Sequence, residues 1–258
     1  MDAKIIAGIL AAGGAALAAG GVYRMNKKTG YFKKGNSVRY DVSRIPFKKT
    51  SPLKGKTVVF LGSSVTKGFA DHNNAFAEYI AKKDSCICIK EAVNGTTLID
   101  NCEDSYIERM RDNLDPERQV DLFICQLSTN DATRNSPLGE ISESRDLDSF
   151  DVKTVCGAIE YIIAYAKETW HCRVMFYTNP QYDSDTYAKM VEALLKIQEK
   201  WQIGVIDFWN DERINSISPE KRKLYLQDPI HPMKAGYAEW LVPVMEQRIA
   251  EYLETQVS

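Results

Sequence analysis

The chain has 258 residues with 33 basic and 35 acidic side chains, so its formal net charge is only −2. This balance gives no global attraction to nucleic acid, and no nucleic-acid partner is expected. The length suits one sizeable core, and a hydrophobic content of 44% is ordinary for a globular fold.

The first segment stands apart because residues 5–23 carry no charge. An apolar run of this length can cross a bilayer as a helix, so residues 1–23 are predicted to form a hydrophobic membrane anchor. A cleaved signal peptide and a soluble helix are the alternatives. Small residues recur every four positions, at Gly8, Ala12, Ala16 and Gly20, which favours helix-mediated self-association.

Residues 24–55 are basic and are broken by glycines and prolines, which is typical of a tether near a membrane. More Lys and Arg residues follow the apolar run than precede it, and this bias predicts a domain facing the cytoplasm. A secreted or envelope-facing domain is the alternative. The six cysteines agree with a reducing compartment and lack zinc-ligand spacing, so neither disulfides nor a metal site are expected.

From Lys56 onward, short apolar runs alternate with helical patterns. The predicted strands are Thr57–Leu61, Cys86–Val93, Leu122–Leu127, Val174–Tyr177 and Gly204–Phe208. Among the predicted helices, one is capped by Asp151, one covers Asp185–Trp201 and one begins near Met233. The alternation predicts an α/β fold in which helices cover both faces of a parallel sheet.

Three successive predicted strands are each followed by residues suited to chemistry. The first ends at Gly62 and two serines, Ser63 and Ser64, while Gly95 and Asn130 follow the next two strands. Ligands of such sheets bind beyond the carboxyl ends of the strands. A serine there can be a nucleophile if a base activates it, and N–H groups there can stabilise an oxyanion.

The candidate base is His231, which Asp228 precedes by three residues in a segment stiffened by two prolines. Such a turn can place the carboxylate against the imidazole Nδ1 and leave Nε2 facing a serine. The other two histidines fit structural positions better. His72 lies in a polar stretch typical of a loop, and His171 lies at the end of a helical pattern.

Taken in this order, the four motifs resemble those of the SGNH (GDSL-type) hydrolase family, from about Lys56 to the C-terminus. The resemblance implies a domain at 56–258 that folds as a three-layer α/β/α sandwich around a five-stranded parallel, flavodoxin-like sheet. It implies Ser64, Asp228 and His231 as the catalytic residues. The implied oxyanion hole consists of the Ser64 N–H, the Gly95 N–H and the Asn130 side chain.

Two positions depart from the family pattern, because Ser63 and Ser128 replace its usual Asp and Gly. Neither position supplies a catalytic group, so the implied mechanism is unaffected, although the subfamily is left open. Ser64 is preferred to Ser63 as the nucleophile because it matches the family's serine.

The activity implied is that of a serine esterase or acylhydrolase that works through an acyl-enzyme, with no metal or organic cofactor. The substrate is expected to be a small-molecule, lipid or glycan ester. A glycan O-acetyl group and a lipid or thioester acyl chain both stay open. The alternative hypothesis is a catalytically inactive binding module at the membrane.

Overall fold

The computed structural model describes residues 27, 30 and 33–254. Its sheet consists of β1 (Thr57–Gly62), β2 (Ile87–Ala92), β3 (Leu122–Gln126), β4 (Arg173–Tyr177) and β5 (Gly204–Ile206). The strands are all parallel and lie in the order β2-β1-β3-β4-β5. This is the flavodoxin-like order, so the predicted fold class is confirmed for the described residues.

The α-helices are α2 (Ser64–Lys67), α3 (Phe76–Asp84), α4 (Tyr106–Asn113), α5 (Thr129–Thr133), α6 (Val155–Trp170), α7 (Asp185–Trp201), α8 (Glu212–Asn215), α9 (Pro219–Tyr225) and α10 (Val242–Glu254). The 3₁₀ turns are Lys34–Asn36, Val38–Tyr40, Val42–Arg44 and Leu147–Ser149, and a π-helical segment covers Gly236–Leu241.

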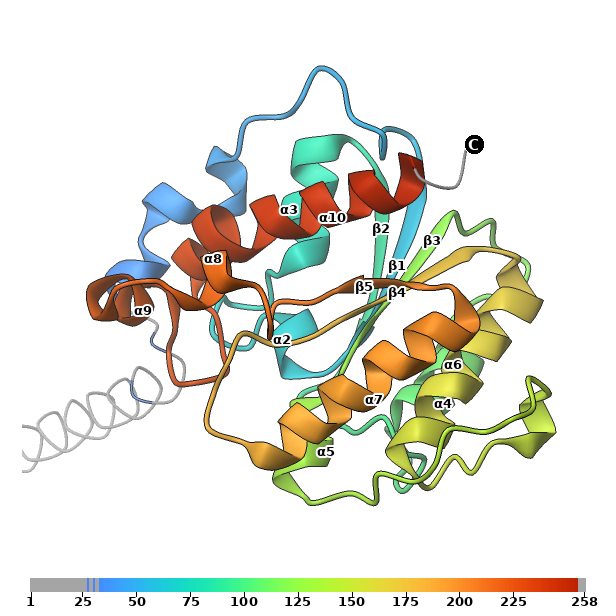
Figure 1. Ribbon diagram of the computed structural model, residues 1–258. Coiled ribbons are helices and arrows are strands. Elements are labelled where there is room, and N and C mark those ends of the chain that lie inside the picture. The colour runs from blue at the N-terminus through green and yellow to red at the C-terminus, as the bar shows by residue number, and fades with distance from the viewer. Residues whose placement is uncertain (1–26, 28–29, 31–32, 255–258) are drawn as a thin grey trace, which may run out of the picture.

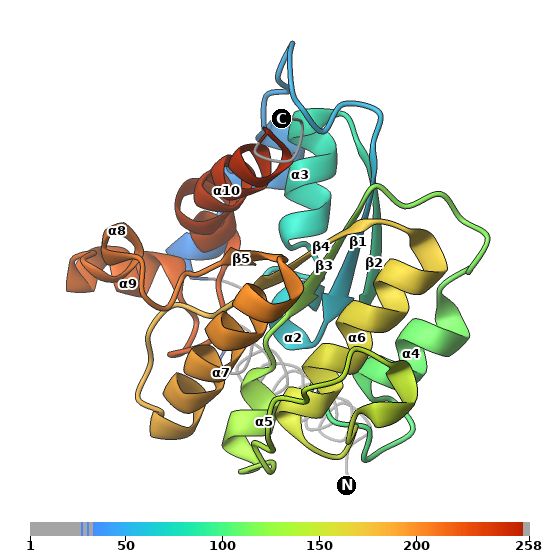
Figure 2. The same ribbon diagram turned by 45° about the vertical axis from the view of Figure 1, so that its right-hand side comes forward.

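Helices cover both faces of the sheet, with α3 and α10 on one side and α4, α6 and α7 on the other (Figures 1 and 2). Alternate residues of β1 divide between these layers. Val59 and Leu61 pack among α4 and α6, whereas Val58 and Phe60 pack toward α3 and α10. All four are fully buried or nearly so, as expected for a strand covered on both faces.

Several predicted boundaries shift for local reasons. The prediction of Asp151 as an N-cap was wrong, since α6 begins at Val155 and the Thr154 side chain accepts the Gly157 N–H at 3.3 Å. In contrast, α7 covers Asp185–Trp201 as predicted. The strands β2 and β5 are shorter than expected. The π-helical segment ends just before Pro243, whose missing N–H interrupts regular helical bonding.

The part of the expected tether that the structure describes packs against the domain. Its three 3₁₀ turns lie on the face covered by α3 and α10. Tyr40 is 9% exposed and Leu53 is 2% exposed, and both belong to the core on that face. Residues 33–55 therefore form part of the packed structure.

The predicted hydrophobic helix at 1–23 lies outside the described residues. Within residues 27, 30 and 33–254, no helix combines the length and apolar character that a membrane crossing requires. The membrane anchor and the self-association therefore stay predictions.

Candidate active site

The strand β1 leads directly into Ser64. Gly62 ends the strand, Ser63 has φ −115° and ψ −137°, and Ser64 is the first residue of α2. A side chain at position 62 is excluded, because its Cβ would lie 1.8 Å from Thr66 Oγ1. Ser64 is 6% exposed and stands at the carboxyl end of the sheet.

The hydroxyl of Ser64 meets the imidazole of His231 although 167 residues separate them. Ser64 Oγ lies 2.8 Å from His231 Nε2. On the other side of the ring, His231 Nδ1 lies 2.8 Å from Asp228 Oδ2 and 3.0 Å from Asp228 Oδ1. The structure therefore brings the three predicted residues into one hydrogen-bonded chain.

The carboxylate of Asp228 is held in place by its own turn. Its Oδ1 accepts the backbone N–H groups of Ile230 and His231, each at 2.9 Å. Burial raises the pKa of Asp228, but the hydrogen bonds with the His231 ring and with these N–H groups outweigh it and lower the pKa below its usual value. Asp228 is therefore ionised at neutral pH and can accept the Nδ1–H of His231.

Asn130 reaches the site from α5. Ser128 is the N-cap of this helix and its side chain accepts the N–H groups of Asn130 at 3.2 Å and Asp131 at 3.3 Å. The Asn130 Nδ2 donates to Ser63 Oγ at 3.1 Å and to Thr96 O at 3.0 Å. The amide thus lies next to the residue that precedes Ser64, and its two hydrogen bonds go to Ser63 and Thr96.

Gly95 lies on the loop after β2, next to Thr96. It has φ +82°, a conformation that favours glycine, and its carbonyl accepts a hydrogen bond from Arg134 at 2.8 Å. Its connection to the site runs through Thr96, whose carbonyl accepts the Asn130 amide. Gly95 therefore lies near the hydrogen-bonded residues Ser64, His231 and Asp228 but makes no hydrogen bond with them.

A buried arginine that the sequence did not indicate joins two of these strand ends. Arg109 is 3% exposed, and its Nη2 donates to Gly62 O at 2.9 Å and to Thr96 Oγ1 at 3.1 Å. Its Nη1 also pairs with Glu91 at 3.0 Å. Arginine is rarely buried, so its place within a charged helical stretch gave no signal of this role.

Gln126 connects the β3 strand to the nucleophile turn. Its Oε1 accepts the Ser63 N–H at 2.9 Å and the Thr66 hydroxyl at 2.8 Å. Ser63 itself is fully buried, and its hydroxyl faces the Asn130 amide. Ser63 thus takes part in local hydrogen bonds, while Ser64 faces the histidine.

A cavity of about 500 Å³ opens beside the histidine. Its lining residues are Thr133, Tyr182, Asp183, Ser184, Asp228, Pro229, Ile230 and His231. The walls from Tyr182, Pro229 and Ile230 are largely apolar, whereas His231 and Asp228 are polar. The cavity can therefore receive part of a substrate next to the reactive groups.

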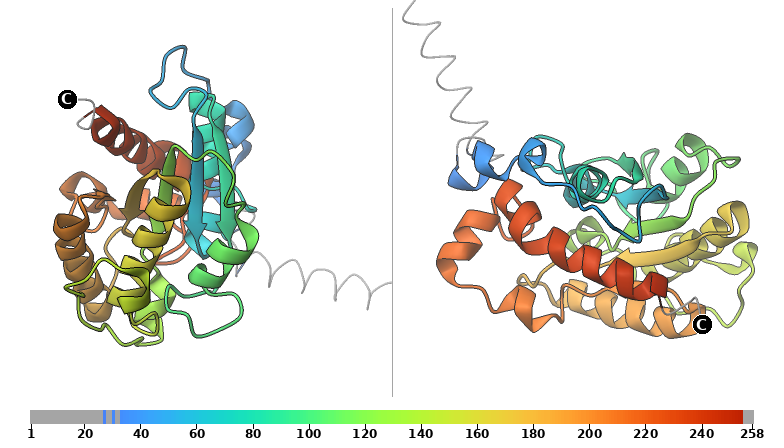
Figure 3. Two further views of the ribbon diagram at one scale, coloured as in Figure 1. Left: turned by 90° about the vertical axis from the view of Figure 1, so that its right-hand side faces the viewer. Right: turned by 90° about the horizontal axis from the view of Figure 1, so that it is seen from above.

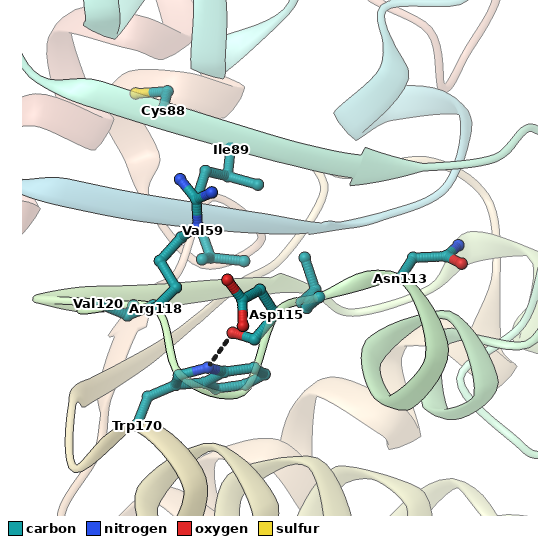
Figure 4. A pocket seen from close by; sticks show the side chains of 9 residues that line it. Val59, Cys88, Ile89, Asn113, Asp115, Arg118, Val120 and Trp170 are labelled. Atoms are coloured by element: carbon teal, nitrogen blue, oxygen red, sulfur yellow. Dashed lines mark hydrogen bonds between the residues drawn. The ribbon is translucent and has the colours of Figure 1, made fainter.

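A second cavity, of about 380 Å³, lies at the opposite end of the sheet (Figure 4). Its walls include Val120 and Trp170, which precede β3 and β4, and the Trp170 Nε1 donates to Asp115 O at 3.0 Å. The lining contains neither Ser64 nor His231. This cavity is therefore separate from the candidate active site.

The fold is that of α/β proteins with a parallel sheet. At the carboxyl edge of this sheet, a serine forms a hydrogen-bonded chain with a histidine and an aspartate. The model of the GDSL-like Lipase/Acylhydrolase family matches residues 60–239, more than half of the chain. The chain therefore belongs to this family and is an ester hydrolase of the SGNH/GDSL type. The alternative of an inactive binding module has no support from these findings.

Solved structures share the fold. A protein described as a GDSL-like lipase from Bacteroides ovatus ATCC 8483 has a TM-score of 0.55 and 15% identity, covering 79% of this chain and 100% of its own. A lipolytic G-D-S-L family protein from Desulfitobacterium hafniense DCB-2 has a TM-score of 0.55 and 17% identity, covering 75% and 99%.

A carbohydrate esterase of family two from Clostridium thermocellum, in complex with cellohexaose, is also similar. Its TM-score is 0.54 with 13% identity, and the match covers 82% of this chain and 67% of that one. At these identities the similarity concerns the fold alone. Among curated proteins, none matches this chain.

Proposed function

We propose that this protein is a serine esterase in which Ser64 forms an acyl-enzyme with the help of His231 and Asp228. The observation that carries the proposal is the 2.8 Å distance between Ser64 Oγ and His231 Nε2, with Asp228 on the far side of the ring. An ionised Asp228 keeps the Nδ1 proton in place, which leaves the Nε2 lone pair free to accept the serine proton.

The first half of the reaction forms the acyl-enzyme. Ser64 Oγ attacks the ester carbonyl while His231 takes its proton, and the ester C–O bond then breaks as His231 passes that proton to the leaving alcohol. In the second half, a water molecule gives a proton to His231 and attacks the acyl group. The acid leaves and Ser64 regains its proton.

Hydrogen-bond donors must stabilise the negative charge that develops on the carbonyl oxygen of the ester. The Ser64 N–H lies in the first turn of α2, where backbone N–H groups lack intrahelical acceptors. We assign the other two donors to the Gly95 N–H and the Asn130 Nδ2. The Asn130 amide can turn one of its two N–H groups from Ser63 toward the oxyanion.

Asn130→Ala is expected to lower kcat by about 10²–10³-fold with a small change in KM, because an oxyanion donor acts mainly in the transition state. Steady-state kinetics with p-nitrophenyl acetate measure both constants. Asn113→Ala is the matched control, since Asn113 lines the cavity at the other end of the sheet. Similar kcat values in the two variants contradict the role of Asn130.

The position of the cavity beside His231 indicates which half of the ester binds there. The leaving alcohol must lie near Nε2 to receive its proton, and His231 and Asp228 form one wall of this cavity. We therefore place the alcohol half of the ester in the cavity. For the acyl half we propose a small group, as in an O-acetyl ester.

A series of p-nitrophenyl esters from acetate to octanoate tests this function in the full chain. Turnover of the acetate ester is expected, with kcat/KM falling as the acyl chain lengthens. A rise in kcat/KM toward octanoate contradicts the small acyl group and favours a lipid ester. The absence of turnover across the series contradicts the esterase proposal itself.

A further inference from the structure

The segment that precedes β1 contacts the loop that follows the Ser64 helix and the loop that carries His231. Ser64 is followed by the loop at 68–75, and His231 lies on the loop at 226–233. Residues 33–41 lie beside the second of these loops (Figure 3). This segment precedes the 60–239 region that the family model matches, so its contacts are additional to the family's domain.

Asn36 connects the loop at 68–75 with Lys234, the residue directly after the loop at 226–233. Its side chain is 8% exposed, and its Nδ2 donates to Ala70 O at 2.8 Å and to Gly30 O at 3.0 Å. Its Oδ1 accepts the backbone N–H of Lys234 at 3.0 Å. One carboxamide therefore connects a residue six positions after Ser64 to a residue three positions after His231.

Further contacts hold the same segment against the loop of His231. Lys33 Nζ donates to Gln227 O at 3.1 Å, and the Lys234 ammonium pairs with the Asp41 carboxylate. Gly35 packs closely against the backbone of Leu224, because a Cβ at position 35 would lie 2.1 Å from Leu224 O. Asn36 is thus held within a set of contacts on one side of the loop.

The two connected loops also touch directly at the proposed site. The ring of Phe69, next to Ala70, lies 4.9 Å from the His231 ring. Ser64 begins α2, which leads directly into the loop at 68–75, and His231 lies on the other loop. Relative movement of the two loops is therefore expected to change the distance between Ser64 Oγ and His231 Nε2. Proton transfer is sensitive to this distance, and a misplacement of about 1 Å can cost about 10²-fold in rate.

We propose that Asn36 is a positioning residue that sets the distance between Ser64 and His231 by holding the loop after α2 against the residue that follows the His231 loop. It acts through the loops and does not touch the reacting atoms. This inference rests on the proposed function, because it assumes that Ser64 and His231 act as nucleophile and base. It assigns a catalytic contribution to a segment outside the matched family region.

The test compares Asn36→Ala with Ser51→Ala in the full chain. Ser51 lies in the same N-terminal segment and also makes two hydrogen bonds, to Asp84 at 2.7 Å and from the Leu53 N–H at 3.1 Å. These contacts involve neither of the two loops. Ser51→Ala therefore controls for a loss of packing in this segment.

Both variants are assayed at a temperature where circular dichroism shows them fully folded. Asn36→Ala is expected to lower kcat for p-nitrophenyl acetate and the rate of labelling by a fluorophosphonate, each by about 10-fold or more. KM is expected to stay within about threefold, because Asn36 does not line the cavity. Ser51→Ala is expected to keep the wild-type kcat and labelling rate.

The outcomes separate this inference from the proposed function. A folded Asn36→Ala variant with the kcat and labelling rate of the wild type, or of Ser51→Ala, overturns the positioning role and leaves the esterase proposal intact. A wild-type chain that neither labels nor hydrolyses the ester overturns the proposed function instead.

Asn36→Asp decides the question if Asn36→Ala fails to fold. Its carboxylate still accepts the Lys234 N–H but can no longer donate to Ala70 O. The expected result is a smaller fall in kcat, of about threefold or more, with little change in KM. A wild-type kcat in this variant overturns the inference.

Discussion

Ser64→Ala is expected to lower kcat for p-nitrophenyl acetate by about 10⁴–10⁶-fold, because it removes the atom that forms the acyl-enzyme. The hydroxyl makes its 2.8 Å contact with His231, and its loss leaves the backbone of α2 unchanged. The melting temperature is therefore expected to stay within about 4 °C of the wild type. Steady-state kinetics and a thermal melt measure the two effects.

Ser63→Ala is the matched control, since it removes a hydroxyl from the neighbouring residue. The backbone N–H of residue 63 keeps its hydrogen bond to Gln126 in this variant, while the side-chain contacts with Asn130 and Gln126 Oε1 are lost. Its kcat is expected to fall by no more than about 10-fold, because the nucleophile and base remain. A fully inactive Ser63→Ala beside an active Ser64→Ala contradicts the assignment of the nucleophile.

Asp228→Asn is expected to lower kcat by about 10³–10⁴-fold with little change in fold. The Asn Oδ1 can still accept the N–H groups of Ile230 and His231, so the turn is retained. The new NH₂ group then stands where Oδ2 lay, 2.8 Å from His231 Nδ1, and donates to that nitrogen. The ring proton moves to Nε2, which can no longer accept the proton of Ser64.

Asp183→Asn controls for a change of charge in the same cavity. Asp183 lines the cavity beside His231, and it takes no part in the hydrogen bonds of the His231 ring with Ser64 and Asp228. A change in KM is expected for this variant because the alcohol half is proposed to bind in this cavity, but its kcat is expected to stay within about threefold of the wild type. The tautomer argument is refuted if Asp228→Asn and Asp183→Asn show equal kcat values in the same assay.

The layers of the fold follow from periodicity that is visible in the sequence. Continuous apolar runs such as Val58–Leu61 predicted strands covered on both faces, and the observed β1 divides its side chains between two helical layers. The order of the strands cannot be read from such runs, because each run is compatible with several neighbours. The flavodoxin-like order came from the family resemblance and is confirmed.

The strand pattern placed Ser64 at the carboxyl edge of the sheet, but it gave no position for His231, which follows α9 and not a strand. The meeting of the two residues was expected from the family resemblance. The contacts that support this meeting were not predictable. A buried Arg109 has the same sequence signature as an exposed one, and only the fold shows its contacts with Gly62 and Thr96. The contacts of Asn36 could not be predicted either, because the basic, Pro- and Gly-containing composition of residues 24–55 indicated a tether.

The central claim is that Ser64 is an activated nucleophile, and mass spectrometry after treatment with a fluorophosphonate tests it most directly. The reagent bonds covalently to a serine whose proton a neighbouring base can remove. We predict one adduct on the intact wild-type chain, located by peptide mapping at Ser64, and no adduct on Ser64→Ala. An unmodified wild-type chain, or an adduct that persists in Ser64→Ala, contradicts the account.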